Sequence, residues 1–162
     1  MNVLRLASAA CSLMVALGLA TSMGMASAGA QEISVRIIRV KALDKIDANS
    51  AADFYTQVTI AGETFKSEPI QDNDDIEPGW VFTKKVAGGV HNVKIAIIDK
   101  DVTKDDAVDV NRVGGKRDLD FRVHTGRCII TGFSEPYRCG ATIFRSGYEK
   151  RRAEVSFVVN VR

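Results

Sequence analysis

The chain has 162 residues, with 22 Lys or Arg, 20 Asp or Glu and a formal net charge of +2. Arg5 is the only charged residue before position 31, so residues 31–162 hold 21 basic and 20 acidic side chains. This balance, without any run of Lys or Arg, gives no indication of nucleic-acid binding.

The first 30 residues have the three-part plan of a secretory signal peptide. Arg5 precedes an apolar run from Leu6 to about Leu19, and small residues follow up to Ala28-Gly29-Ala30. The apolar run is short and is interrupted by two serines and a glycine, which argues against a membrane anchor. We expect cleavage before Gln31 and an exported protein, either periplasmic or secreted.

Residues 31–162 are enough for one domain with a hydrophobic core and too few for two. None of their apolar stretches approaches the ~20 residues that a bilayer-crossing helix needs. We therefore expect a signal peptide over residues 1–30 and a single domain over residues 31–162, with no transmembrane segment in the mature chain.

Two cysteines remain after the signal peptide, Cys128 and Cys139. In an oxidising compartment an even pair is most simply a disulfide. A metal site would need further ligands at close spacing, and no His lies between the two; a redox pair would have the C-x-x-C spacing. We expect a structural disulfide that contributes roughly 2–3 kcal/mol by closing a loop of about a dozen residues.

Short segments of the mature chain alternate between apolar and polar residues, which is the pattern of half-buried β-strands. Residues 33–40 alternate with one slip at Ile38, and Gly88-Gly89 is one of several turn signals. Residues 69–79 are acidic and proline-containing, which indicates a solvated connection. No window has a sustained helical period. We predict an all-β, antiparallel β-sandwich of seven to eight strands, drawn from residues 33–40, 54–60, 64–67, 80–86, 90–99, 119–123 and 155–161 and short apolar pieces near 129–130 and 143–144.

Acidic residues are concentrated in two loops between these strands. The strand over residues 90–99 runs into a segment with four carboxylates in eight residues: Asp99, Asp101, Asp105 and Asp106. At ~5 Å and an effective dielectric constant near 20, each close pair costs roughly 3 kcal/mol, so a fold that gathers them should place a cation among them. Oxygen ligands favour a hard ion such as Ca²⁺. A second acidic loop, containing Asp47 and Asp53, is the candidate for the other half of such a site.

Three motifs in the chain occur in a recognisable order. Asp47 and Asp53 are separated by five residues and are followed by Phe54-Tyr55; Glu77-Pro78-Gly79-Trp80 enters a strand; and Asp99-Lys100-Asp101 ends one. In this order and at these separations, residues 33–110 resemble a C2 domain, the β-sandwich that binds calcium between loops at one end. The family's first loop usually has a Pro before the Tyr, which this chain lacks.

The resemblance implies a calcium site built from both loops, with backbone carbonyl oxygens filling the remaining positions. The implied side-chain ligands are Asp47 and Asp53 in the first loop and Asp99, Asp101 and Asp105 or Asp106 in the third, with Asp109 as a weaker candidate. The last Asp of the family often comes a residue or two later than it does here. Beyond Asp109 the resemblance fades, and the cysteine segment has no counterpart in it.

The resemblance also implies a binding function. In C2 domains that bind membranes, calcium joins the acidic loops to anionic phospholipid headgroups. We therefore expect an exported calcium-binding domain that docks to anionic lipid or to an envelope surface through these loops. The alternative is a calcium-stabilised structural module that binds another envelope or secreted protein without binding membranes. The loop tips, Ala48, Ala51, Ala52 and Val102, offer little apolar area for insertion into a bilayer.

The sequence contains no arrangement that is typical of an enzyme. His91 and His124 stand near predicted strand ends, outside any Gly-x-Ser-x-Gly or His-Glu-x-x-His pattern. Paired carboxylates can hydrolyse glycosides, but acids clustered in calcium-like loops are better explained as metal ligands. We expect no enzymatic activity.

Overall fold

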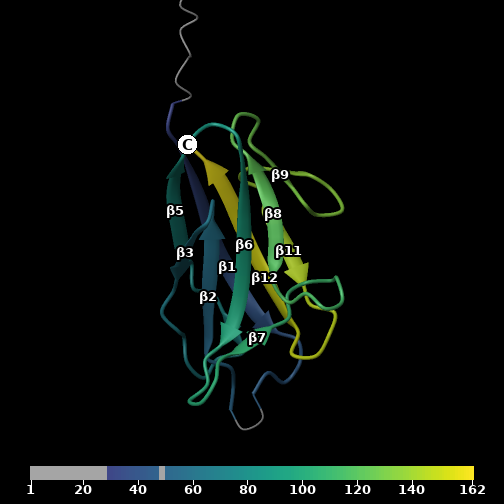
Figure 1. Ribbon diagram of the computed structural model, residues 1–162. Helices are drawn as coiled ribbons and strands as arrows, with labels where there is room; N and C mark the ends of the chain where they lie inside the picture. The colour runs from purple at the N-terminus through teal and green to yellow at the C-terminus, as the bar shows by residue number, and fades with distance from the viewer. Residues whose placement is uncertain (1–28, 48–49) are drawn as a thin grey trace, which may run out of the picture.

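The computed structural model describes residues 29–47 and 50–162, which form two antiparallel β-sheets packed face to face (Figure 1). The signal peptide that we predict lies almost wholly outside the described residues. None of the described residues forms a helix with the length and apolar character that a membrane crossing requires.

The described residues contain twelve strands. In chain order they are β1 (Gln31–Ala42), β2 (Phe54–Ile60), β3 (Glu63–Lys66), β4 (Asp75–Ile76), β5 (Val81–Val86), β6 (Val90–Asp99), β7 (Asp106–Val108), β8 (Leu119–His124), β9 (Ile129–Thr131), β10 (Tyr137–Arg138), β11 (Thr142–Ser146) and β12 (Ala153–Val161). One sheet has the order β11-β12-β1, with β4 and β5 both paired to β1. The other has the order β10-β9-β8-β6-β2-β3, with β7 paired to the end of β6. The predicted β-sandwich is confirmed.

The slip in the alternation of the first strand marks a β-bulge. The pairing of β1 with β12 runs Ile37 opposite Phe157 and then Arg39 opposite Ser156, so Ile38 is an extra residue in β1. The extra residue shifts the alternation of side chains by one position, so that Val40, and not Arg39, is the next residue after Ile37 to point into the core. Both Ile37 before the bulge and Val40 after it are therefore fully buried.

The core lies between the two sheets and consists mostly of Ile, Val and Phe side chains that point inward from each strand. Phe121 of β8 stacks on Phe157 of β12 with ring centroids 5.6 Å apart, so an aromatic pair joins the sheets. Phe133, in the loop after β9, packs against Phe121 at 5.3 Å and closes that edge of the sandwich. Each such pair adds about 0.5–1.5 kcal/mol beyond the area that it buries.

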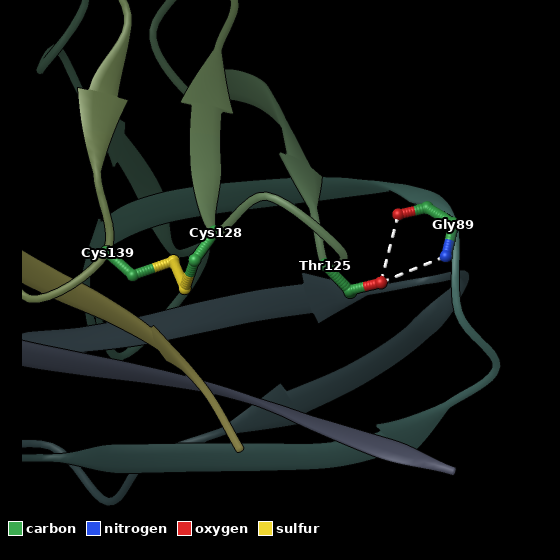
Figure 2. The surroundings of a disulfide bond; sticks show 4 residues. All are labelled: Gly89, Thr125, Cys128 and Cys139. Carbon is green, nitrogen blue, oxygen red and sulfur yellow. Dashed lines mark hydrogen bonds between the residues drawn. A yellow bond between two sulfur atoms is a disulfide. The ribbon is translucent and has the colours of Figure 1, made fainter. Parts of the chain in front are cut away.

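The predicted disulfide is present and joins Cys128 to Cys139, whose Cα atoms are 5.3 Å apart (Figure 2). It closes the β9–β10 hairpin, where the Cys139 N–H also donates to the Cys128 carbonyl. In the turn before β9, the hydroxyl of Thr125 accepts from the Gly89 N–H at 2.9 Å and lies 3.1 Å from the Gly89 carbonyl, to which it donates. The disulfide and this contact hold the end of the sandwich opposite the acidic loops.

Candidate calcium site

The two acidic loops lie together at one end of the sandwich, far from the C-terminus (Figure 1). β2 begins where β6 ends, because the two strands are antiparallel neighbours with Phe54 opposite Asp99. This register places Asp53, the last residue of the β1–β2 loop, beside the first residues of the β6–β7 loop. The sheet itself therefore brings the two predicted halves of the site together.

Direct hydrogen bonds join the two loops. The Asp53 backbone N–H donates to Oδ1 of Asp99 at 2.7 Å, and the Lys100 N–H donates to the Asp53 carbonyl at 3.0 Å. The second oxygen of the Asp99 carboxylate takes part in none of the hydrogen bonds among the described residues. Oδ2 is therefore the less engaged of the two Asp99 oxygens, although Oδ1 also keeps a second lone pair.

Asp99 is a buried carboxylate in an acidic environment. It is the last residue of β6, points inward and is only 3 % exposed. Burial raises the pKa of Asp99 above the ordinary value of an aspartate, and the nearby carboxylates of Asp101, Asp47 and Asp53 raise it further. The Asp53 N–H acts in the opposite direction, since it stabilises the charged form. A divalent cation would remove the repulsion that these four carboxylates impose on one another.

The loop between β3 and β4 also contacts the site. The Asp72 N–H donates to Oδ1 of Asp53 at 2.8 Å, and Oδ1 of Asp74 accepts from the Ala52 N–H at 3.0 Å. The sequence indicated only a solvated connection here. The high density of Asp in this segment was a signal of a role at the acidic end, but only the fold shows that it supports the first loop.

Asp105 and Asp106 have partners of their own. Oδ2 of Asp105 accepts from the Tyr55 hydroxyl at 2.7 Å, and burial together with this carboxylate raises the pKa of Tyr55 to about 12. Asp106 forms an ion pair with Arg151, from the loop between β11 and β12. Asp106 is also the first residue of β7, so the acidic loop is one residue shorter than predicted. Asp106 nevertheless lies directly opposite Asp99 in the β6–β7 pairing, so it stays near the acidic group while one of its oxygens is used by Arg151.

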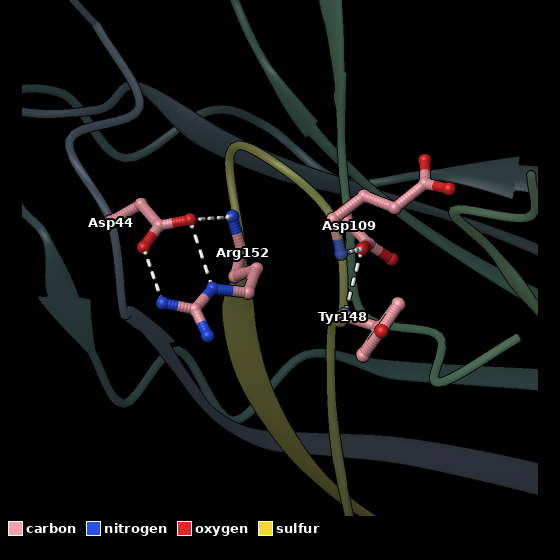
Figure 3. Close-up of polar contacts among 5 residues, drawn as sticks. Asp44, Asp109, Tyr148 and Arg152 are labelled. Atoms are coloured by element: carbon pink, nitrogen blue, oxygen red, sulfur yellow. Dashed lines mark hydrogen bonds and ion pairs between the residues drawn. The ribbon is translucent and has the colours of Figure 1, made fainter. Parts of the chain in front are cut away.

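Asp109 has a structural role (Figure 3). It is fully buried, and its carboxylate accepts three backbone N–H bonds: from Asn111 at 2.9 Å, from Tyr148 at 2.8 Å and from Glu149 at 2.6 Å. These bonds fix the β11–β12 loop against the segment after β7. Asp109, the weaker ligand candidate, is thus occupied by backbone donors.

A second anchor of the β11–β12 loop is the pair of Asp44 and Arg152 (Figure 3). The Arg152 guanidinium donates from Nη2 to Oδ1 at 2.7 Å and from Nε to Oδ2 at 3.0 Å, and the Arg152 backbone N–H donates to Oδ2 at 3.2 Å. These bonds lower the pKa of Asp44 to about 2. Because Asp44 begins the first acidic loop, this contact ties that loop to β12.

The donor chemistry of the site fits a hard divalent cation. Carboxylate oxygens come from Asp47, Asp53, Asp99 and Asp101, and loop carbonyls can add to the 6–8 oxygens that Ca²⁺ takes. Within the described ranges, no three His, Cys, Asp or Glu side chains are already gathered in a metal-binding arrangement. Filling such a site would require the carboxylates to turn toward a common centre.

The family of the chain follows from comparison with known proteins. The C2 domain model matches residues 31–127, which is more than half of the chain. The chain belongs to the C2 domain family, as its resemblance indicated. The match extends past the range 33–110 that the motifs suggested and stops just before the disulfide segment. A search of curated protein sequences finds no match.

Solved structures have the same fold at low sequence identity. A C2 domain protein from Ramazzottius varieornatus matches with a TM-score of 0.54 and 16 % identity, over 83 % of this chain and 89 % of that one. A calcium-bound structure of two C2 domains, A and B, of extended-synaptotagmin 2 matches with a TM-score of 0.55 and 13 % identity, over 83 % of this chain and 46 % of that one.

Human GIVD cytosolic phospholipase A2, in complex with methyl gamma-linolenyl fluorophosphonate, matches with a TM-score of 0.54 and 17 % identity. The alignment covers 82 % of this chain but only 17 % of the phospholipase chain. The matching part is the C2 domain of the phospholipase and not its catalytic domain.

Proposed function

We propose that this C2 domain binds calcium at its acidic end. The observation that carries the proposal is the direct joining of the two acidic loops, in which the Asp53 N–H donates to the Asp99 carboxylate and the Lys100 N–H to the Asp53 carbonyl. This contact leaves one oxygen of a buried carboxylate for a cation, with Asp47, Asp53 and Asp101 close enough to act on it.

The six acids have different roles in the proposal. Asp99 and Asp101 are the central ligands, with Asp47 and Asp53 facing them from the first loop. Asp105 and Asp106 share their carboxylates with Tyr55 and Arg151, so we expect a second ion that uses them to bind more weakly than the first. Extracellular calcium modules commonly have dissociation constants of ~10⁻⁴–10⁻³ M, and we expect this site in that range.

Calorimetric titration with calcium tests the site directly. The native protein should bind at least one ion, and Asp99→Asn/Asp101→Asn should bind none at the same concentration. A matched control is Asp120→Asn/Glu135→Gln, which removes the same number of negative charges from exposed positions on β8 and in the β9–β10 loop. Equal calcium binding by the native protein and the Asp99/Asp101 variant would contradict the assignment.

We further propose that the calcium-loaded loops dock the domain to a surface of anionic phospholipid. C2 domains generally bind calcium and lipids, and bound calcium would turn a repulsive acidic end into one that attracts phosphate groups. Val102 is fully exposed in the β6–β7 loop, but it is one small side chain. Docking should therefore be mostly electrostatic, and 0.5 M salt should weaken it because exposed charges are screened.

The second candidate is a calcium-stabilised module that binds another exported protein. It is favoured by the anchoring of the acidic end, where Asp44 holds Arg152 and Asp106 holds Arg151. Sedimentation with anionic phospholipid vesicles distinguishes the two candidates. Docking predicts that the protein pellets with the vesicles in 1 mM calcium and remains in solution in chelator. Calcium binding without sedimentation would favour the structural module.

Export remains a proposal. It is supported by the three-part pattern of residues 1–30 and by a disulfide, a bond that is typical of oxidising compartments. Mass spectrometry of the protein recovered from the periplasm or the medium should give an N-terminus at Gln31. A cell-associated protein that retains residues 1–30 would contradict it.

A further inference from the structure

A pocket lies on the side of β8 away from β2, between the β7–β8 loop, the β9–β10 loop and β11. Its volume is about 300 Å³, and its walls include Val113, Leu119 and Phe133. Part of the pocket comes from residues beyond position 127, where the match to the family model ends. It is separate from the acidic loops.

Arg145 of β11 forms one wall in a fixed position. Its guanidinium carbon lies 4.2 Å from the ring centroid of Phe133 and 5.3 Å from that of Tyr137. Nη2 donates to the Tyr137 hydroxyl at 3.2 Å, and Nη1 donates to the Phe144 carbonyl at 3.1 Å. These contacts hold the guanidinium in place. Because a guanidinium has five N–H donors, Arg145 can still donate hydrogen bonds to a ligand.

The charge of the pocket is positive. Arg112 and Lys116, from the β7–β8 loop, line it together with Arg145. None of these three cations forms an ion pair within the described part of the chain. The acid among its lining residues is Asp120, which stands opposite Lys94 in the β6–β8 pairing, although Lys94 forms its ion pair with Asp118 at 2.7 Å.

We propose that this pocket binds a small organic oxyanion, a phosphate monoester or a carboxylate carried on a compact apolar or aromatic group. The oxyanion takes hydrogen bonds from Arg145, whose planar fork suits both groups, and is attracted by Lys116 and Arg112. The apolar group packs on Val113, Leu119 and Phe133. A volume near 300 Å³ is at the lower end of ligand pockets, which limits the ligand to about the size of one ring.

Titration of the ¹⁵N-labelled protein by NMR tests the proposal, with phenyl phosphate and benzoate as the probes. Chelator is present throughout, so that calcium at the acidic loops cannot bind the probes. At least one of the two should give saturable shifts in residues 111–116, 132–134 and 145, and the tighter of them identifies the oxyanion. Benzyl alcohol, which has the ring without the charge, should bind at least about tenfold more weakly.

Two variants assign the binding to these residues. Arg145→Gln and, separately, Lys116→Gln should each weaken it, Arg145→Gln by about tenfold or more because a charge-assisted hydrogen bond is lost. Lys116 is exposed and makes no stacking contact, so its variant tests the pocket even if Arg145→Gln disturbs Phe133. Lys85→Gln, which removes an exposed cation from β5 in the other sheet, is the control and should leave the affinity unchanged.

Several results would overturn the proposal: no saturable shift with either probe, equal binding of benzyl alcohol, or shifts confined to residues outside the pocket. Unchanged affinity in both Arg145→Gln and Lys116→Gln would do the same.

Discussion

Asp99 is a strand residue that is buried like its apolar neighbours but carries a charge. Its position follows from the alternation of β6, in which Val93, Ile95 and Ile97 point into the core and Asp99 continues the same row. One backbone hydrogen bond from Asp53 compensates only part of the cost of burying that charge. The calcium-free protein therefore holds an unfavourable interaction at this residue.

Replacement of Asp99 by Asn should stabilise the calcium-free protein at neutral pH. The amide oxygen can still accept the Asp53 N–H, while the repulsion from Asp101, Asp47 and Asp53 disappears. We expect the free energy of unfolding at pH 7 in chelator to rise by about 1 kcal/mol. Because the pKa of Asp99 is raised in the folded state, this gain should shrink as the pH falls below the pKa and the native carboxyl becomes protonated. A loss of stability at pH 7 would contradict this prediction.

The pair of Asp44 and Arg152 predicts the opposite pH dependence. The pKa of Asp44 is about 2 in the folded protein, below the ordinary value of 3.8, so the pair stabilises the fold above pH 3.8 and loses its effect as the pH falls toward 2. Asp44→Asn should lower the urea midpoint at pH 7, and the difference from the native protein should close between about pH 4 and pH 2. A difference that is the same at both ends of this range would exclude the ion pair as its cause.

The sequence predicted some residue contacts and could not predict others. The density of carboxylates and the resemblance to the C2 family predicted that the loops of Asp53 and Asp99 form one site, and the antiparallel pairing of β2 with β6 brings these two residues together. The partners of Asp105 and Asp106 could not be predicted, because Tyr55 and Arg151 are 50 and 45 positions away in the chain and no pattern links them. Side-chain pairing between distant loops depends on the completed fold.

At the scale of elements, the β11–β12 hairpin depends on one buried carboxylate. Asp109→Ala removes the acceptor for three backbone N–H groups. Hydrogen bonds to a charged group are worth about 1.5–3 kcal/mol each at most, and the three share one carboxylate, so we expect a loss of about 3 kcal/mol in urea denaturation. Asp109→Asn, which keeps one oxygen acceptor, should lose less.

The calcium affinity of an Asp109 variant distinguishes the structural role of this residue from a role as a calcium ligand. The Asp109→Asn protein should retain the calcium affinity of the native protein, measured by calorimetry, because the carboxylate faces backbone donors and not the other acids. A large loss of calcium affinity in a folded Asp109→Asn protein would instead identify Asp109 as a calcium ligand.

The disulfide stabilises the β9–β10 hairpin, whose strands have only three and two residues. Cys128→Ser/Cys139→Ser opens a loop with a sequence separation of 11 residues. We expect a loss of roughly 2–3 kcal/mol in the free energy of unfolding, with the acidic end unaffected because it lies at the other end of the sandwich. Equal stability of the native and double-serine proteins under non-reducing conditions would contradict this prediction.

Strand length decided which elements the sequence could predict. β1, β2, β5, β6, β8 and β12 have six or more residues, enough for alternation to appear, and all were predicted. β4 and β10 have two residues each and β7 has three, so no periodicity can be recognised in them; β9 also has three residues and was predicted from two adjacent isoleucines, not from alternation. Their pairing comes from the longer strands beside them: β4 lies along β1, and β7 lies along the end of β6.

For the molecule as a whole, the sandwich places two chemically different groups of residues apart from each other. The acidic loops gather at one end, while the pocket of Arg112, Lys116 and Arg145 opens at a lateral edge formed in part by the segment after residue 127. The gathering of the acidic loops was predictable because their residues adjoin long strands and follow the order of the family. The pocket was not, because Phe133 and Arg145 are brought together only by the packing of the two sheets.

Calcium binding at the acidic end is tested most directly by thermal unfolding of the purified protein in 1 mM calcium and in chelator. For a dissociation constant near 10⁻⁴ M, mass action predicts about 1.4 kcal/mol of added stability, or a rise of roughly 3–6 °C in the melting temperature. We expect this rise in the native protein and in Asp120→Asn/Glu135→Gln, and its disappearance in Asp99→Asn/Asp101→Asn. Equal melting temperatures of the native protein in calcium and in chelator would contradict calcium binding at this end of the sandwich.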